Sequence, residues 1–297
     1  MSDGPARTLH DAEFAVDTGL VAELVAEQFP ELSDLPVRDF RSTGTVNTIF
    51  LLGDDLYARL PRVEVWAHHL DLEWRWLPVL APQLTLRVPQ PVKRGSPSGS
   101  YPYSWSIYRW IRGQPYADDL VVDEVRAAGD LARFIGELRS CASVPGAPTS
   151  GRGPLRALDR SIRVALDRAG TAIDRGAALA AWDGVLDAAE WTGPPGWVHG
   201  DLLRPNLLVD EGRICAVLDF GCVGVGDPAA DVVAAWSVFG PSGREAFRAT
   251  LDVDDDTWSR ARGYALYQAA WIIPYYADTN PEFVRQAIRT VAEVLTP

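Results

Sequence analysis

The feature that most constrains this chain is a polar motif at the two outer ends of a predicted β-hairpin. His199-Gly200-Asp201 and Asn206 precede the hairpin, and Asp219-Phe220-Gly221 follows it. The hairpin is predicted over 207–218 because two apolar runs flank an Asp-Glu-Gly turn. Folding it brings Asn206 and Asp219 face to face, so this part of the chain is predicted to build a polar site.

These residue types suit phosphoryl transfer from a nucleoside triphosphate, ATP or GTP. The reaction needs a carboxylate that orients the attacking hydroxyl and accepts its proton, and Asp201 fits that role. It also needs oxygen ligands for Mg²⁺, and Asn206 and Asp219 supply them. Taken singly, His199 can be a core histidine and Asn206 a turn residue beside a proline. As a set, they predict an enzyme.

The order H-G-D-x4-N, hairpin, D-F-G and then Gly226-Asp227-Pro228-Ala229-Ala230-Asp231 resembles the aminoglycoside phosphotransferase family. The resemblance runs from about Phe40 to the C-terminus. It implies an α+β, protein-kinase-like, two-lobed fold. The small β-rich N-lobe would carry one or two helices, and the larger C-lobe would be mainly helical. The implied activity is a phosphotransferase with an alcohol group as acceptor.

The resemblance also implies roles for individual residues. Asp201 would be the catalytic base, Asn206 and Asp219 would bind magnesium, and His199 would brace the loop. Asp231 opens the next helix, where it would stiffen the loop by accepting backbone hydrogen bonds, and we also consider it as a substrate contact. Taken alone, it can be an ordinary N-terminal helix residue.

We call the segment 199–206 the catalytic loop. It departs from the family at Leu203-Arg204-Pro205, where His-Pro-Gly or a similar sequence is common. The spacing from Asp201 to Asn206 is kept. Arg204 either reaches the transferring phosphate, as a catalytic residue, or is solvated.

We expect two lobes, 1–111 for nucleotide binding and 112–297 for catalysis and substrate binding. Hydrophobic periodicity predicts helices over 19–29 and 63–77 in the first lobe, with strands over 37–41, 46–52, 56–60, 91–94 and 103–111. In the second lobe it predicts helices over about 119–142, over 154–190 in one or two pieces, and over 228–239, 242–251, 255–273 and 281–295.

A nucleotide-binding lobe needs a small-residue turn over the phosphates and a cation on the following strand. The segment 42–48 can form that turn, with Ser42, Thr43, Gly44 and Asn47 as candidate nucleotide contacts. Arg59 is the candidate cation, because the chain has one lysine, Lys93, against 27 arginines. A guanidinium can hold phosphates in bidentate fashion. Glu73 would orient Arg59, although each of these residues also has an ordinary structural interpretation.

The family resemblance places a hinge at 108–113. The backbone groups of Arg109 and Ile111 would pair with the purine edge of the nucleotide. An ordinary strand end is the alternative.

The acceptor would lie against the C-terminal helices, which are rich in aromatic and acidic residues. Helix packing explains most of this pattern, but we keep four candidate substrate contacts besides Asp231: Trp271, Tyr275, Asp278 and Glu282. Acids there would suit a cationic aminoglycoside-type antibiotic. A macrolide, a peptide antibiotic or a sugar metabolite is the alternative acceptor, so the role in resistance or metabolism stays open.

Composition narrows the partners. The net charge of −12 argues against nucleic acid, whose phosphates need clustered cations. No run approaches the ~18 apolar residues of a membrane span. Three scattered cysteines and the absence of a secretory leader suggest a soluble cytoplasmic protein. We expect a monomer.

The sequence argues against three other kinds of protein. Residues 224–229 match the dinucleotide-binding pattern G-x-G-x-x-A, but Asp227 places negative charge where a pyrophosphate would bind, and no alternating strands follow. The acidic run 252–256 fails as a calcium loop because Thr257 and Gly263 occupy its sixth and twelfth positions. A non-catalytic pseudokinase would have lost one of the catalytic residues, and all of them are present.

Overall fold

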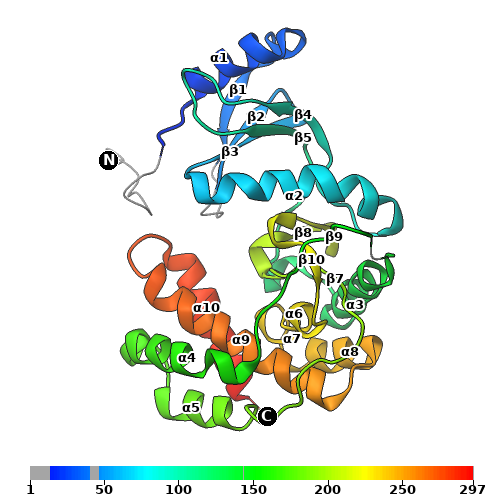
Figure 1. Cartoon of the computed structure of the whole chain (residues 1–297), viewed down its shortest axis with the longest axis vertical. Helices are drawn as coiled ribbons and strands as arrows, with labels where there is room; N and C mark the ends of the chain where they lie inside the picture. Colours follow the sequence, from blue (N-terminus) through cyan, green and yellow to red (C-terminus); the bar gives the residue numbers. More distant parts are fainter. Residues whose placement is uncertain (1–13, 41–46, 143, 297) are drawn as a thin grey trace. The chain divides into compact units, whose positions relative to one another are not determined.

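The computed structural model describes residues 14–40, 47–142 and 144–296 (Figure 1). The chain divides into two compact units, Met1–Ala81 with Val88–Arg112, and Pro82–Arg87 with Gly113–Pro297. The short segment 82–87, which we expected in the N-terminal lobe, groups with the second unit. The reason is a parallel bridge between Arg87 and Ala216, with hydrogen bonds from Arg87 N to Cys215 O (3.2 Å) and from Val217 N to Arg87 O (2.9 Å).

The first unit is built on one antiparallel sheet with the strand order β1-β2-β3-β5-β4. Its strands are β1 (Val37–Phe40), β2 (Asn47–Leu52), β3 (Leu56–Pro61), β4 (Pro91–Gly95) and β5 (Trp105–Arg109). All five were predicted from the sequence, with ends that differ by up to two residues. The helices are α1 (Thr18–Gln28) and α2 (Glu64–Leu80), and α2 continues past Pro78, where we expected it to stop.

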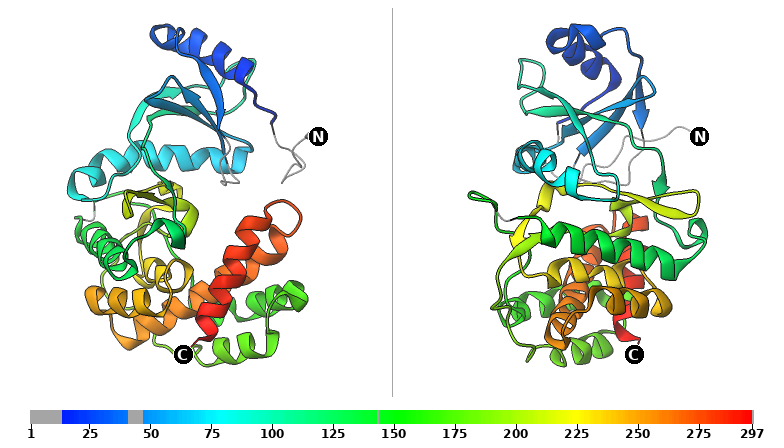
Figure 2. Two further views of the ribbon diagram at one scale, coloured as in Figure 1. Left: turned by 180° about the vertical axis from the view of Figure 1, so that it is seen from behind. Right: turned by 90° about the vertical axis from the view of Figure 1, so that its right-hand side faces the viewer.

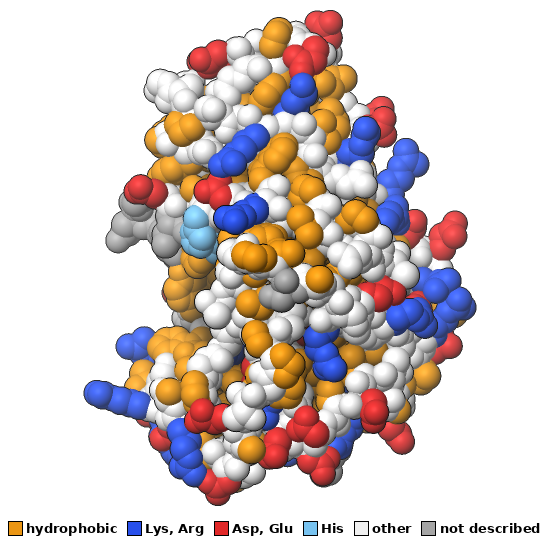
Figure 3. Space-filling model, turned by 45° about the vertical axis from the view of Figure 1, so that its right-hand side comes forward, with side chains coloured by type: hydrophobic (Ala, Val, Ile, Leu, Met, Phe, Trp, Pro, Cys, Tyr) orange, Lys and Arg blue, Asp and Glu red, His pale blue; other side chains and the backbone are white. Residues whose placement is uncertain are grey.

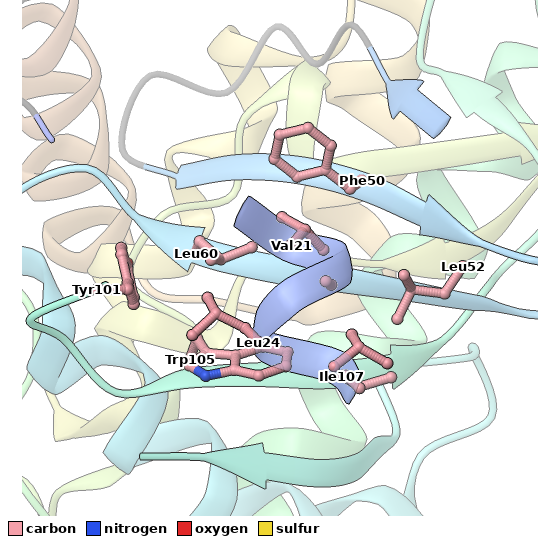
Figure 4. Packing of buried hydrophobic residues seen from close by; sticks show 10 residues of the cluster. Val21, Leu24, Phe50, Leu52, Leu60, Tyr101, Trp105 and Ile107 are labelled. Carbon is pink, nitrogen blue, oxygen red and sulfur yellow. The ribbon is translucent and has the colours of Figure 1, made fainter. Parts of the chain in front are cut away.

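Side-chain alternation along the strands separates an apolar face from a polar one. Ala58 and Leu60 of β3 point into a core with Ile107 of β5 and the buried face of α1 (Figure 4). The intervening residues Arg59 and Tyr108 point to the other face, where both hydrogen-bond to Glu73 of α2. The two helices therefore cover opposite faces of the sheet, and the polar face carries the predicted phosphate anchor.

The second unit is mainly helical, with two small sheets. The helices are α3 (Glu124–Ser140), α4 (Leu155–Ala169), α5 (Arg175–Asp183), α6 (Ala229–Val232), α7 (Ala234–Ser237), α8 (Pro241–Leu251), α9 (Asp255–Tyr275) and α10 (Pro281–Leu295). α9 and α10 pack side by side, and α4 also packs against α9 (Figure 2). One sheet has the order β6-β8-β9 and contains β6 (Gln114–Pro115), β8 (Leu207–Asp210) and β9 (Arg213–Val217). The predicted hairpin is β8–β9.

The second small sheet explains the misleading glycine pattern. β7 (Gly196–Val198) pairs antiparallel with β10 (Gly224–Gly226), and neither strand was predicted. A Cβ atom on Gly226 would lie 2.1 Å from the Ser150 carbonyl oxygen, and one on Gly224 would lie 2.6 Å from that of Pro148. The two glycines therefore allow another backbone segment to pass closely, and they do not open a phosphate-binding turn.

On the face shown in Figure 3, acidic and basic side chains are interspersed and form no large patch of one sign. Within the described ranges, no helix combines the length and apolar character needed to cross a membrane.

Candidate active site

The catalytic loop joins β7 to β8 and makes its sharp turn at Gly200. This residue has φ +83°, and a Cβ atom there would lie 2.7 Å from Ser150 Oγ and 2.9 Å from Cys222 O. Glycine is required both by the positive φ and by the crowding. The loop ends in a short 3₁₀ turn, Arg204–Asn206, which leads directly into β8.

Two side chains hold the start of this loop. The carboxylate of Asp231 accepts hydrogen bonds from the backbone N–H groups of His199 and Gly200, each at 2.8 Å. His199 Nδ1 accepts from the Asp201 N–H at 3.2 Å, so its Nε2 carries the proton and donates to Leu218 O at 2.9 Å. His199 thus ties the catalytic loop to the end of β9.

Asp231 was also considered as a substrate contact, and that assignment is wrong. Its side chain is fully buried, and each carboxylate oxygen accepts a backbone hydrogen bond from the catalytic loop. Burial raises the pKa of Asp231, and this is opposed by the charges and hydrogen bonds of the loop around His199 and Gly200. Asp231 therefore acts on the loop, because a buried carboxylate engaged in this way cannot also bind an acceptor.

Asp201 is positioned by hydrogen bonds to both oxygens of its carboxylate. Asn206 Nδ2 donates to Asp201 Oδ2 at 3.1 Å and to the Asp201 carbonyl at 2.9 Å. Gln268 Nε2, on α9, donates to Asp201 Oδ1 at 2.8 Å. Burial and the neighbouring Asp219 carboxylate raise the pKa of Asp201, against the opposing effects of His199, Arg152 and Gln268. A positioned carboxylate with a raised pKa suits a general base.

The residues expected to bind magnesium fit a cation by their chemistry. Because Asn206 directs its amide nitrogen at Asp201, its amide oxygen is the atom that can serve as a metal ligand. Leu218 N donates to Asn206 O at 2.7 Å, which brings the end of β9 beside Asn206. Asp219 follows in a left-handed conformation with φ +60°. Its carboxylate is close enough to Asp201 to raise that residue's pKa, a repulsion that a bound cation would relieve.

The Arg204 side chain is engaged by groups outside the catalytic loop. Its side chain is 8% exposed, so the solvated alternative is wrong. Its Nη1 and Nη2 donate to Asp118 at 3.1 and 2.6 Å, and Nε and Nη2 donate to Val238 O at 3.0 and 2.7 Å. The guanidinium also lies over the ring of Tyr116. These contacts do not support the catalytic assignment, because Nε, Nη1 and Nη2 of Arg204 all donate to structural partners.

In the first unit, the predicted phosphate anchor is part of a buried network. Arg59 Nη1 donates to Glu73 Oε1 at 2.8 Å, and Tyr108 Oη donates to Glu73 Oε2 at 2.6 Å. The side-chain amide of Asn47 lies against Arg59, and with its oxygen turned toward the guanidinium it accepts from Nε and Nη2, each at 2.9 Å. Glu73 and Asn47 therefore orient Arg59 from two sides. Ser42, Thr43 and Gly44 lie outside the described residues.

Two backbone N–H groups of the predicted hinge are already engaged. Arg109 N donates to Gln90 O at 3.0 Å, and Trp110 N donates to Asp55 O at 2.8 Å. A purine contact by Arg109 is therefore restricted to its carbonyl oxygen. Ile111 follows the end of β5 and is partly exposed.

The remaining acceptor candidates lie along α9 and at the start of α10. Trp271 and Tyr275 are three and seven positions after Gln268, so they share a helix face with it. Trp271 Nε1 donates to Ser161 Oγ at 3.2 Å, and Tyr275 is 51% exposed. Asp278 is exposed in the turn after α9. Glu282 is exposed in the first turn of α10 and pairs with Arg285.

Two residues near Asp201 were not identified from the sequence. Gln268 is an unremarkable polar residue inside a predicted helix, with no local signal that it contacts the catalytic loop. Arg152 carries a charge that acts directly on Asp201. Its only sequence signal is its place between Gly151 and Gly153, which flank it in a loop.

The fold agrees with comparisons to known proteins. The model of the phosphotransferase enzyme family matches residues 39–264, so this chain belongs to that family. The predicted kinase-like α+β fold is confirmed, because solved phosphotransferases share it. The GDP complex of wild-type aminoglycoside 2'-phosphotransferase-IIIa matches with TM-score 0.70 and 20% identity, over 93% of this chain and 99% of that one. Macrolide 2'-phosphotransferase MphH from Brachybacterium faecium matches with TM-score 0.59 and 23% identity, over 93% and 98%.

A relative in sequence is "Uncharacterized protein YcbJ" of Bacillus subtilis (strain 168). It is 29% identical over 174 residues, which make up 57% of this chain and 52% of that protein. The alignment thus spans about half the length of that relative.

Proposed function

We propose that the protein transfers the γ-phosphoryl group of a nucleoside triphosphate to a hydroxyl group of a small molecule. The observation that carries this proposal is the Asp201 carboxylate, which is held by Asn206 and Gln268 beside the Asp219 carboxylate. Family membership and the solved neighbours that contain GDP or ADP support a nucleotide substrate. The sequence keeps Asp201, Asn206 and Asp219, and this argues against a pseudokinase.

In this mechanism the chain's own groups orient and deprotonate the acceptor. Asp201 accepts a hydrogen bond from the acceptor hydroxyl and takes its proton as the oxygen attacks phosphorus. Asn206 and Asp219 would hold Mg²⁺, which neutralises charge on the phosphates when bound. Arg59, oriented by Glu73, would contact the α- and β-phosphates. The Arg109 carbonyl and Ile111 would meet the purine, and Ser42, Thr43 and Gly44 would cover the phosphates.

For the acceptor, we propose an aminoglycoside-type antibiotic as the first class to test. One solved neighbour is a complex with kanamycin and another with gentamicin, which supports this choice. Two other neighbours are macrolide phosphotransferases, so a macrolide is the second class, followed by a peptide antibiotic or a sugar metabolite. Trp271, Tyr275, Asp278 and Glu282 are the proposed acceptor-side residues.

The test is a panel of hydroxyl compounds scored for triphosphate consumption and for phosphorylated product, with ATP and GTP in parallel. Asp201→Asn should lower turnover at least ~10²-fold, because it removes the general base. The matched control is Asp210→Asn, an exposed carboxylate at the turn of the β8–β9 hairpin, which should retain turnover. Full activity of Asp201→Asn would overturn the assignment of the base.

A further inference from the structure

A strand-like segment, residues 148–150, is fastened against β10. Val225 N donates to Pro148 O at 2.7 Å, Ser150 N donates to Val225 O at 3.0 Å, and Thr149 forms a parallel bridge with Val225. Ser150 Oγ donates to Cys222 O at 2.5 Å, just after the Asp219-Phe220-Gly221 motif. The close approach to the β10 glycines shows that this segment is built into the catalytic part of the fold.

The segment places Arg152 at the catalytic loop. Ser150 packs directly on Gly200, the residue before Asp201, since a Cβ atom on Gly200 would lie 2.7 Å from Ser150 Oγ. On the other side, Tyr264 Oη of α9 donates to Gly153 O at 3.2 Å. Arg152 is therefore held between one anchor on the loop and another on the helix that contributes Gln268.

Arg152 lies close enough to Asp201 for their charges to interact. Burial lowers the pKa of this guanidinium, and Asp201 is the strongest of the groups that oppose this effect. Within the part of the chain that the structure describes, the Arg152 side chain makes no hydrogen bond and no ion pair shorter than 4 Å. An arginine has five N–H donors, so a half-buried guanidinium in this state is well suited to bind an anion.

Phosphoryl transfer creates a need for such a cation. Negative charge spreads over the equatorial oxygens of the transferring group, and an arginine supplied from the same chain can stabilise it. The only arginine in the loop 199–206 is Arg204, which is committed to Asp118 and Val238. Arg59 belongs to the other unit and is engaged by Glu73 and Asn47. Arg152 can therefore fill a role that the catalytic loop leaves open.

We propose that Arg152 is a catalytic residue whose guanidinium donates hydrogen bonds to the transferring phosphoryl group. This inference rests on the proposed phosphotransferase function. In the step, Asp201 takes the hydroxyl proton, the acceptor oxygen forms a bond to phosphorus, and the bond from phosphorus to the β–γ bridging oxygen breaks. The leaving nucleoside diphosphate retains that electron pair. Arg152 contributes neither atoms nor protons, and it stabilises charge only.

The experiment compares ground-state with transition-state binding. The affinities for Mg²⁺–ADP and for Mg²⁺–ADP with aluminium fluoride are measured by calorimetry for the wild type, Arg152→Ala and Arg152→Lys. Arg152→Ala should bind ADP within about threefold of the wild type yet lose about 10³-fold affinity for the aluminium fluoride complex, with a similar loss in kcat. Arg152→Lys should recover part of both. Arg156→Ala, which removes an exposed arginine paired with Asp187, is the matched control and should change neither affinity.

The other possible results distinguish a failure of the Arg152 inference from a failure of the proposed function. Circular dichroism and the retained ADP affinity confirm that the variants fold. If Arg152→Ala keeps full affinity for the aluminium fluoride complex while the wild type is active, the inference fails and the proposed function stands. A rise in KM for an acid-bearing acceptor, with unchanged aluminium fluoride affinity, would instead make Arg152 an acceptor anchor and overturn the proposal. A wild type that neither binds this complex nor consumes triphosphate with any acceptor would overturn both.

Discussion

Gln268 and Asp201 are joined by a 2.8 Å hydrogen bond from Nε2 to Oδ1, although 67 positions separate them in the sequence. The bond connects α9 to the catalytic loop. Together with the hydrogen bond from Asn206, it gives each oxygen of the Asp201 carboxylate a donor. The orientation of the proposed base therefore depends on a helix outside the loop 199–206.

Replacing Gln268 with leucine should lower kcat about tenfold or more, because a hydrogen bond to a charged group contributes about 1.5–3 kcal/mol. The nucleotide KM should change little, since Gln268 contacts Asp201 and no proposed nucleotide ligand. The measurement is steady-state kinetics with the best acceptor from the panel. Gln286→Leu is the control, because Gln286 lines the same cavity of about 10 Å³ between α9 and α10. Equal losses in both variants would argue against a specific effect on the base.

Replacing Glu73 with alanine should destabilise the first unit by about 3–5 kcal/mol, because it leaves the buried Arg59 guanidinium without its carboxylate. Tyr108 Oη loses its acceptor in the same variant. Urea denaturation measures the change. The control is Asp71→Ala, because Asp71 lies on the same helix as Glu73 and pairs with Arg94 of β4 at the surface; it should cost at most about 1 kcal/mol. Similar values for both variants would contradict the buried network.

Substitutions of Asp231 should lower the stability of the protein in steps. Asp231→Ala leaves the His199 and Gly200 N–H groups without an acceptor, and each buried orphan costs about 1–3 kcal/mol. Asp231→Asn keeps one acceptor oxygen and should fall between the wild type and the alanine variant. Thermal unfolding ranks the three proteins, and kcat should follow the same order because the loop carries Asp201. An alanine variant as stable as the wild type would exclude the bracing role.

Asp130 should contribute stability that depends on pH. It is buried on α3 and accepts hydrogen bonds from Arg213 and Arg133, each at 3.0 Å. Burial by itself would raise the pKa of Asp130, but the hydrogen bonds from Arg213 and Arg133 outweigh it, so the pKa is lowered. A lowered folded-state pKa means that the charged form stabilises the fold above the unfolded value of about 3.9. The contribution is lost as the pH falls through the folded-state pKa.

Asp130→Asn should therefore reduce the free energy of unfolding by about 1–2 kcal/mol at pH 7, a value discounted because both arginines are half exposed. The difference from the wild type should shrink below about pH 4. Urea titrations between pH 7 and pH 3 measure it. Asp187→Asn, which removes an exposed carboxylate, should differ from the wild type by less than about 0.5 kcal/mol throughout. A difference for Asp130→Asn that grows with acidity would reverse the assigned direction of the shift.

Much of the site could be predicted because its signals are local. The hairpin 207–218 places Asn206 beside the residues before Asp219, and it is specified by apolar alternation and by a turn at Glu211 and Gly212, both with positive φ. The strand β3 likewise separates Arg59 from its apolar neighbours by simple alternation. The short strands β6, β7 and β10 were missed because runs of two or three residues carry no periodicity.

Local sequence patterns were misleading for residues whose roles depend on contacts with distant parts of the chain. Arg204 follows the proposed base by three positions, yet it pairs with Asp118, 86 positions away, because a buried guanidinium requires a carboxylate. The glycines of β10 match a dinucleotide-binding pattern, yet they serve the close passage of residues 148–150.

The sequence was enough to indicate the family and the reaction class, and it predicted the base and its metal ligands, since all of these signals lie within one short loop and hairpin whose geometry is set by neighbouring residues. Which distant side chains complete the candidate site depends instead on how the helices and strands pack together. Gln268 reaches Asp201 because α9 packs beside the catalytic loop, and Arg152 lies near it because β10 holds residues 148–150 in place. Such contacts join segments that are far apart along the chain, and no local periodicity encodes them.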